Sequence, residues 1–118
     1  MLRMVFFLKG STGSTEKELS YYGTATALSV GRRYLAGASV GDYALFGGGN
    51  TGSYTDVVDA YNTSLTRSTP TALSVARHYL AGASVGDYAL FGGGYAGSYS
   101  DVVDAYNTSL TRSTPTAL

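Results

Sequence analysis

An internal repeat constrains this chain more than any other feature of its sequence. Residues 26–70 align without a gap with residues 71–115, and 40 of the 45 positions are identical. A third copy begins at residues 116–118 and stops there. Repeats of about 20–50 residues are typical of solenoids, propellers and arrays, in which each unit packs against its neighbours. The sequence therefore predicts two copies of one structural unit, preceded by a different segment over residues 1–25.

Each unit contains four short segments with strand character. In the first unit they are residues 34–40, 43–46, 56–61 and about 65–73. Gly41-Asp42 is typical of a two-residue hairpin turn, and the side chains of Asn62-Thr63-Ser64 favour a local turn. Pro70 lacks a backbone donor and moves the fourth segment toward a sheet edge. Four short antiparallel strands make one propeller blade, so the predicted fold class is all-β.

Three parts of the unit resemble the kelch repeat. They are Leu45-Phe46-Gly47-Gly48, then Val57-Val58-Asp59-Ala60-Tyr61-Asn62, then Arg77 before the next small-residue strand. The resemblance covers residues 26–115 and implies kelch-like propeller blades with partners held at one end. Arg67 and Arg112 lie where that family usually has a tryptophan. We expect the aliphatic parts of their side chains to pack along the blade face.

The first 25 residues look like a degraded half-blade. The segment from Val5 to Gly10 resembles residues 89–94, and residues 18–22 correspond to a fourth strand. A short helix from Glu16 to Tyr22 is the alternative, because Thr15 and Glu18 form a capping-box pattern. Strand is favoured by the tyrosines and the serine.

The apolar run at the N-terminus, Met4 to Leu8, is shorter than a signal peptide or a membrane span requires. We therefore expect no signal peptide, no membrane partner and, by default, a cytoplasmic location.

Two blades cannot bury both of their outer faces, so the sequence predicts an incomplete propeller that is completed by oligomerisation. Head-to-tail contacts close into rings or continue as filaments. A homotrimer of two-blade chains, or a homodimer in which residues 1–25 complete a third blade, would reach the range of about 4–8 blades in closed propellers. A fragment of a longer array is a further alternative.

Nothing in the sequence indicates catalysis, a metal site or a cofactor. The net charge is zero, which gives no basis for nucleic-acid binding, and there is no cysteine. Gly47, Gly49 and Gly52 match a dinucleotide-binding pattern, but a strand follows where that site needs a helix. His78 is the only histidine, and we expect it to be an exposed loop side chain. The repeated acids, among them Asp56 and Asp59, are expected at turns and strand ends.

The differences between the two units suggest where a ligand would bind. All five fall in two connections, which emerge at the same end of an up-and-down blade. We take this end as the candidate ligand-binding surface, because loops often hold functional residues as well as accepting neutral substitutions. Its candidate residues are Arg33, Asn50, Thr51, Thr55, His78, Tyr95, Ala96 and Ser100.

Three functions are compatible with these patterns. The preferred one is a non-enzymatic interaction module that assembles with itself and presents the loops to a protein or glycan. The second is a purely structural ring or fibre protein. The third is a propeller enzyme whose sites are shared between chains.

Overall fold

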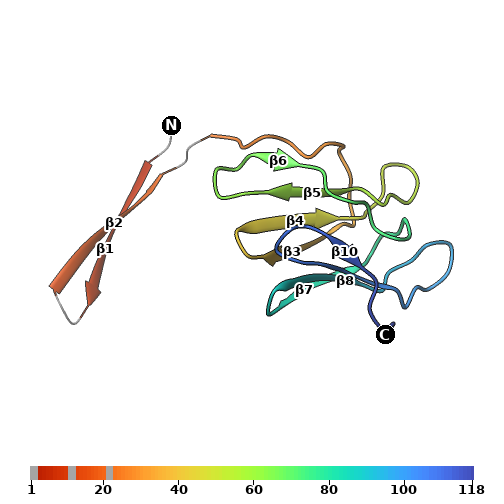
Figure 1. The fold of residues 1–118 in the computed structure, drawn as a ribbon. Coiled ribbons are helices and arrows are strands. Elements are labelled where there is room, and N and C mark those ends of the chain that lie inside the picture. Colours follow the sequence, from red (N-terminus) through yellow and green to blue (C-terminus); the bar gives the residue numbers. More distant parts are fainter. Residues whose placement is uncertain (1–2, 11–12, 21–22) are drawn as a thin grey trace.

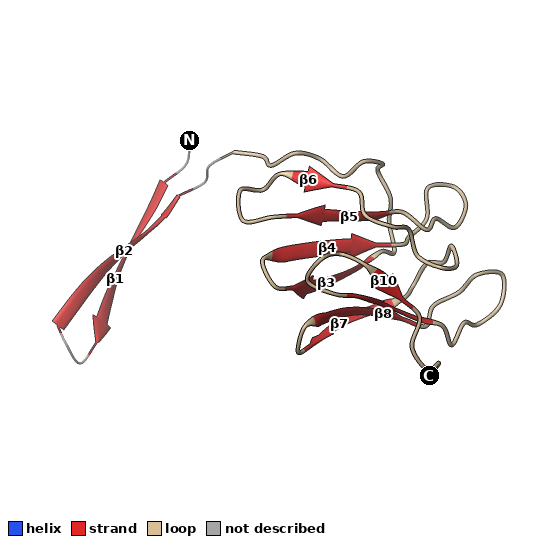
Figure 2. Cartoon of the chain, viewed as in Figure 1, coloured by secondary structure: helices blue, strands red, loops and turns tan. Residues whose placement is uncertain are grey.

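The computed structural model describes residues 3–10, 13–20 and 23–118, in which three antiparallel sheets form and no helix occurs (Figures 1 and 2). A hairpin of β1 (Arg3–Gly10) and β2 (Gly13–Ser20) comes first. The first sheet has the order β3-β4-β5-β6 and the second sheet β10-β9-β8-β7. Within these ranges the chain has no helix of the length and apolar character that a membrane span requires.

The two four-stranded sheets are copies of one another. The first contains β3 (Ala36–Val40), β4 (Tyr43–Gly47), β5 (Val58–Tyr61) and β6 (Arg67–Ser68). The second contains β7 (Ala81–Val85), β8 (Tyr88–Gly92), β9 (Val103–Tyr106) and β10 (Arg112–Ser113). Consecutive strands are neighbours in both sheets, which confirms the all-β prediction and is compatible with propeller-like blades.

The predicted turns form for the expected chemical reasons. Val40 pairs with Tyr43 across a two-residue turn, and Gly41 adopts a φ of 53° there, which glycine accommodates without strain. In the turn after β5, the side-chain oxygen of Asn62 accepts hydrogen bonds from the backbone N–H groups of Ser64 and Thr66, both at 3.0 Å. Asn107 repeats this arrangement in the second sheet.

Several strand boundaries differ from the prediction. The first strand begins at Ala36 rather than residue 34, because Tyr34 has a φ of 60° and cannot extend the strand. The third begins at Val58 rather than residue 56. The fourth covers only Arg67–Ser68, and the chain after it returns along the first unit, where the N–H of Leu73 bonds the carbonyl of Asp56.

In the N-terminal segment, the strand interpretation is confirmed and the helix interpretation is wrong. Residues 16–20 belong to β2 and pair antiparallel with β1, from Arg3 opposite Ser20 to Gly10 opposite Gly13. Tyr21 and Tyr22, the end of the predicted strand, lie outside the described residues.

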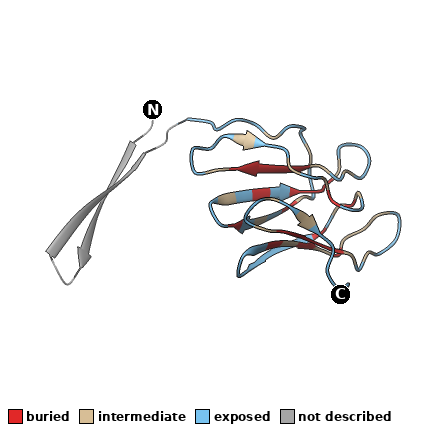
Figure 3. Ribbon diagram, in the orientation of Figure 1, coloured by how far each residue is buried: buried red, intermediate tan, exposed pale blue. Residues whose placement is uncertain are grey.

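The core lies between the two sheets, and each sheet contributes a different face to it (Figure 3). Side chains alternate along a strand, so Leu45 and Gly47 lie on one face of β4 and Ala44 and Phe46 on the other. We call these the Gly face and the Phe face. The Gly face of the first sheet packs on the Phe face of the second sheet, whose Phe91 has no exposed surface.

Close contact between the sheets depends on glycine at Gly47. A Cβ atom there would lie 3.1 Å from the ring of Phe91, which is tighter than ordinary packing allows. In the first strands, a Cβ atom on Gly82 would overlap the backbone of Gly37. The two glycines therefore allow β3 and β7 to approach each other closely.

In each unit, a buried ion pair joins the segment that precedes the first strand to the third strand of the sheet. Arg77 has no exposed surface; it donates to the carboxylate of Asp104 at 3.0 Å and to the carbonyls of Val75, Phe91 and Gly93. Ser74 also bonds Asp104, through its N–H and its hydroxyl, both at 3.1 Å. Buried charges persist when they are paired and hydrogen-bonded in this way.

The first sheet repeats this network with Arg32, Asp59 and Ser29. Burial alone would raise the pKa of Asp59, but the hydrogen bonds from Arg32 and Ser29 outweigh burial and hold that pKa below its ordinary value of 3.8. The expectation that the acids occupy turns and strand ends is therefore wrong for Asp59 and Asp104, which lie inside β5 and β9.

Arg67 and Arg112 are half-buried. Each binds the segment that precedes the first strand of its own unit. Arg67 donates to the carbonyl of Ala27 at 2.8 Å, and Arg112 to that of Ala72 at 2.7 Å. Their guanidinium groups also lie 4.0 and 3.9 Å from the buried carboxylates of Asp59 and Asp104.

Candidate functional site

The two connections that hold all five sequence differences meet at one end of the sheets. Arg33 and Asn50 form an antiparallel bridge with N···O distances of 3.1 and 2.8 Å. His78 and Tyr95 form the corresponding bridge in the second unit, at 3.1 and 2.9 Å. The loops after β4 and β8 project on this side of both sheets (Figure 1). We call this side the loop end.

Glycines after β4 shape the first of these loops. Gly48, Gly49 and Gly52 have φ values of 69°, 116° and 116°, which other residues rarely adopt. A Cβ atom on Gly49 would lie 2.7 Å from the carbonyl oxygen of Arg33, so the backbones approach closely at this bridge. Strand β5 follows the loop, as predicted, so these glycines shape a turn and do not open a helix.

Aromatic rings gather where the two units meet at the loop end. The ring of His78 lies 4.8 Å from that of Tyr54, 4.4 Å from Tyr79 and 5.8 Å from Tyr95, measured between centroids. Tyr34 stacks on Tyr79 at 4.2 Å, and hydrogen bonding to the Tyr34 side chain raises the pKa of Tyr79. Such edge-to-face and tilted ring contacts favour the association of the two units at this end.

His78 is also held by an amide of the first unit. The Nδ2 atom of Asn50 lies 3.4 Å from Nδ1 of His78. The prediction of an exposed loop side chain is wrong for this histidine, which is half-buried between tyrosines of both units. Among the described residues, no three of His, Cys, Asp and Glu lie close enough together to hold a metal ion.

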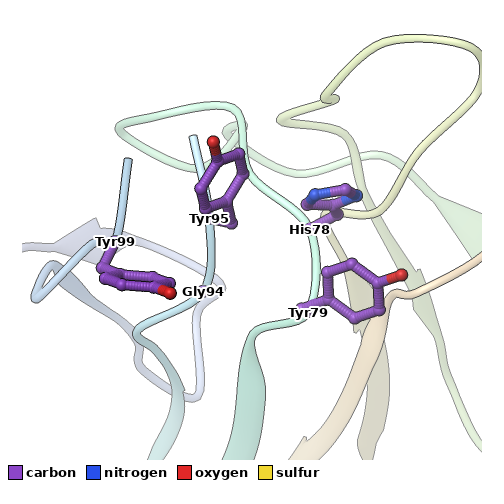
Figure 4. A pocket seen from close by; sticks show the side chains of 5 residues that line it. All are labelled: His78, Tyr79, Gly94, Tyr95 and Tyr99. Atoms are coloured by element: carbon purple, nitrogen blue, oxygen red, sulfur yellow. The ribbon is translucent and has the colours of Figure 1, made fainter. Parts of the chain in front are cut away.

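An open pocket of about 520 Å³ lies beside this cluster, on the outer side of the second unit (Figure 4). His78 and Tyr79 stand on one side of it and Tyr95 and Tyr99 on the other. Tyr99 is 94% exposed, whereas its counterpart Tyr54 is 38% exposed because it packs on His78 and Tyr95. The pocket is thus a row of aromatic surfaces with one side uncovered.

The other four candidate residues have more local roles. The hydroxyls of Thr55 and Ser100 accept hydrogen bonds from the N–H groups of Val57 and Val102 and so stabilise their own loops. The backbone N–H groups of Thr51 and Ala96 bond the carbonyls of Ser53 and Ser98 at the loop tips. The structure therefore brings Arg33, Asn50, His78 and Tyr95 into the junctions, and it leaves the remaining four along the loops.

The tyrosines of this surface were missed because they do not differ between the units. Tyr34, Tyr54, Tyr79 and Tyr99 are identical pairs, so a search for differences passes over them. Eleven tyrosines in 118 residues were a signal that could have found them.

No protein-family model matches this chain, and no similar protein is found among curated proteins.

Proposed function

We propose that this protein is a non-enzymatic interaction module, built of kelch-like blades, that docks head to tail on copies of itself and presents its loop end to a protein or glycan. The proposal follows from the surfaces that the two sheets leave uncovered. A single observation carries it: each outer face of the pair repeats a face that is buried between the sheets.

The outer Phe face belongs to the first sheet. Phe46 is 37% exposed there, while Phe91 at the same position of the second sheet is fully buried. A pocket of about 360 Å³ lies on this face. It is lined by Ala25, Thr26, Leu28, Ala44, Phe46, Tyr61 and Leu65. This surface is therefore apolar and shaped like the one that already packs on a Gly face.

The outer Gly face belongs to the second sheet. Val85 is 60% exposed, against 3% for Val40, and Leu118 is 81% exposed, against 3% for Leu73. A hollow of about 200 Å³ lies on it, lined by Ala81, Gly82, Ala83, Leu90, Gly92, Val103 and Leu118. Exposed apolar surfaces of this kind mark association sites.

The two outer faces are expected to be complementary, because each has the same sequence as one of the two faces that pack together inside the chain. Gly92 of one copy would receive Phe46 of the next in the way that Gly47 receives Phe91 within the chain. Such contacts are heterologous, so they close into a ring or continue as a filament. The kelch resemblance favours a ring, either a homotrimer or a homodimer completed by residues 1–25.

The loop end supports the ligand-binding part of the proposal. Tyrosine dominates many recognition surfaces because it offers a large rigid ring with one polar atom. The acids Asp59 and Asp104 are buried inside β5 and β9 and paired with arginines, which favours a structural role for them over acid–base chemistry.

The molar mass of the chain in solution tests the self-association. We expect a discrete multiple of 12.3 kDa by light scattering behind a sizing column. The variant Gly92→Leu should shift the protein to the single-chain mass, because a Cβ atom at Gly92 meets only ordinary contacts within the chain but would obstruct Phe46 of the next copy. Gly31→Ala is the matched control, since the second unit already has Ala76 at this position. A single-chain mass for the unaltered protein at every concentration would refute self-association.

The ligand-binding part needs its own assay. We expect the assembled protein to bind members of a glycan array or of a displayed peptide library. The loop-tip variant Thr51→Glu with Ala96→Glu should abolish that binding while the mass of the assembly is unchanged, because neither residue lines the aromatic pocket. Capture that is equal for the unaltered protein and the loop-tip variant would contradict a site at the loop end.

A further inference from the structure

The aromatic pocket at the loop end has a counterpart inside the chain, and that counterpart is filled. The residues of the first unit equivalent to the pocket lining are Arg33, Tyr34, Gly49, Asn50 and Tyr54. His78 of the second unit lies against them: its ring is 5.9 Å from Tyr34 and 4.8 Å from Tyr54, and its Nδ1 is 3.4 Å from Nδ2 of Asn50.

At the pocket of the second unit, the position equivalent to His78 would be filled by a residue from a second copy of the chain. If the sheets of two copies dock as the two sheets within the chain do, the residue at the position of His78 is Arg33 of the next copy, because the two positions are equivalent in the repeat. We propose that the pocket of His78, Tyr79, Tyr95 and Tyr99 receives the guanidinium group of Arg33 from a second copy. This inference rests on the proposed function and names the residues that join the copies.

The chemistry of the pocket suits a guanidinium better than an imidazole. Arg33 already lies over a tyrosine ring, with its Cζ atom 4.9 Å from the centroid of Tyr34. Planar guanidinium groups stack on aromatic faces, and each such contact is attractive. In the docked pair Arg33 would lie among Tyr79, Tyr95 and Tyr99, which correspond to Tyr34, Asn50 and Tyr54 around His78.

This arrangement explains two of the five differences between the repeats together. Where the incoming residue is His78, the receiving loop has Asn50, whose amide reaches the imidazole. Where the incoming residue is Arg33, the receiving loop has Tyr95, whose ring faces the pocket (Figure 4). The junction within the chain is thus an amide–imidazole contact, and the junction between chains is a cation–π contact.

The exposure of Tyr99 supports the same geometry. Tyr54 is partly covered by His78 of the second unit, whereas its counterpart Tyr99 is 94% exposed. Arg33 of a second copy would cover Tyr99 as His78 covers Tyr54.

Sedimentation velocity over a concentration series of the full chain tests this inference. Arg33→Ala and Tyr95→Asn should each weaken association of the copies by about tenfold, as expected for loss of one partly desolvated cation–π contact. Arg33→Lys should weaken it less, because the cation is kept and only the planar stacking is lost. The double variant Arg33→His with Tyr95→Asn makes the junction between chains identical in these positions to the one within the chain, and it should restore association.

The controls separate this inference from the proposed function. Gly92→Leu blocks docking of the sheets without touching the pocket, and circular dichroism verifies that each variant is folded. If Gly92→Leu dissociates the copies while Arg33→Ala does not change their affinity, the copies dock but Arg33 does not occupy the pocket. If the unaltered chain stays at the single-chain mass, both proposals are wrong.

Discussion

Strands β3 and β7 have the same sequence, Ala-Gly-Ala-Ser-Val, and opposite surroundings. In β3, Ala36 and Val40 are 7% and 3% exposed, whereas all five residues of β7 are exposed. Their partners within the sheet are also equivalent, since β3 pairs with β4 as β7 pairs with β8. The second sheet covers the face of β3 that carries Ala36 and Val40, and among the described residues no sheet covers the equivalent face of β7. Burial in this molecule is therefore a property of the position in the array and not of the local sequence.

The largest expected effect concerns the two equivalent phenylalanines. Phe91→Ala should lower the free energy of unfolding by about 3–5 kcal/mol, because it empties a fully buried site between the sheets. Phe46→Ala should cost far less in the single chain, since Phe46 is 37% exposed. Chemical denaturation, at concentrations where only single chains are present, compares the two. Equal losses would contradict the assignment of Phe91 to the interface and Phe46 to the surface.

A smaller effect is expected from the glycine pair that faces these rings. Gly47→Leu should destabilise the chain by about 1–3 kcal/mol, because the new side chain has to displace Phe91. Gly92→Leu should leave the unfolding of the single chain almost unchanged, since its nearest side-chain atoms, on Val103 and Leu118, are 3.6 and 3.9 Å from the Cβ position. Thermal unfolding followed by circular dichroism measures both; a larger loss for Gly92→Leu would reverse the assignment of inner and outer Gly faces.

The smallest effect is the pH dependence of the ion pair in the first sheet. The pKa of Asp59 is lower in the folded chain than its ordinary value of 3.8, so the folded state binds fewer protons than the unfolded state. Its contribution to stability is complete above that value and is lost as the pH falls through the lowered pKa. Carbon-13 NMR of the Asp59 carboxyl group should show a midpoint below 3.8, while Asp59→Asn should remove this part of the acid sensitivity. A midpoint at or above 3.8 would contradict the hydrogen bonding described for Arg32 and Ser29.

The strand content could be predicted because the repeat and its turn residues are local signals. Gly41-Asp42 and Asn62 mark turns through their own backbone preferences, so the order of the four strands follows from the sequence. The buried pair of Arg77 and Asp104 could not be predicted in this way. It joins residues 27 positions apart, so it depends on the fold that brings the segment before β7 against β9.

The candidate site was predicted only in part, because the sequence marks some of its residues and not others. The bridges of Arg33 with Asn50 and of His78 with Tyr95 lie at the end where sequence differences gather. The aromatic pocket needs ring positions from two loops, and its tyrosines carry no difference between the units that would single them out.

The seating of Phe91 on Gly47 also has an evolutionary consequence. Each 45-residue unit carries both a phenylalanine (Phe46 or Phe91) and the glycine after it (Gly47 or Gly92), so duplication of a whole unit supplies a new ring and a new recess in matching register. Gain or loss of a unit at the level of the gene therefore requires no compensating substitution at these two positions. An insertion of any other length would separate the ring from its recess, which favours growth of such a gene in whole repeats.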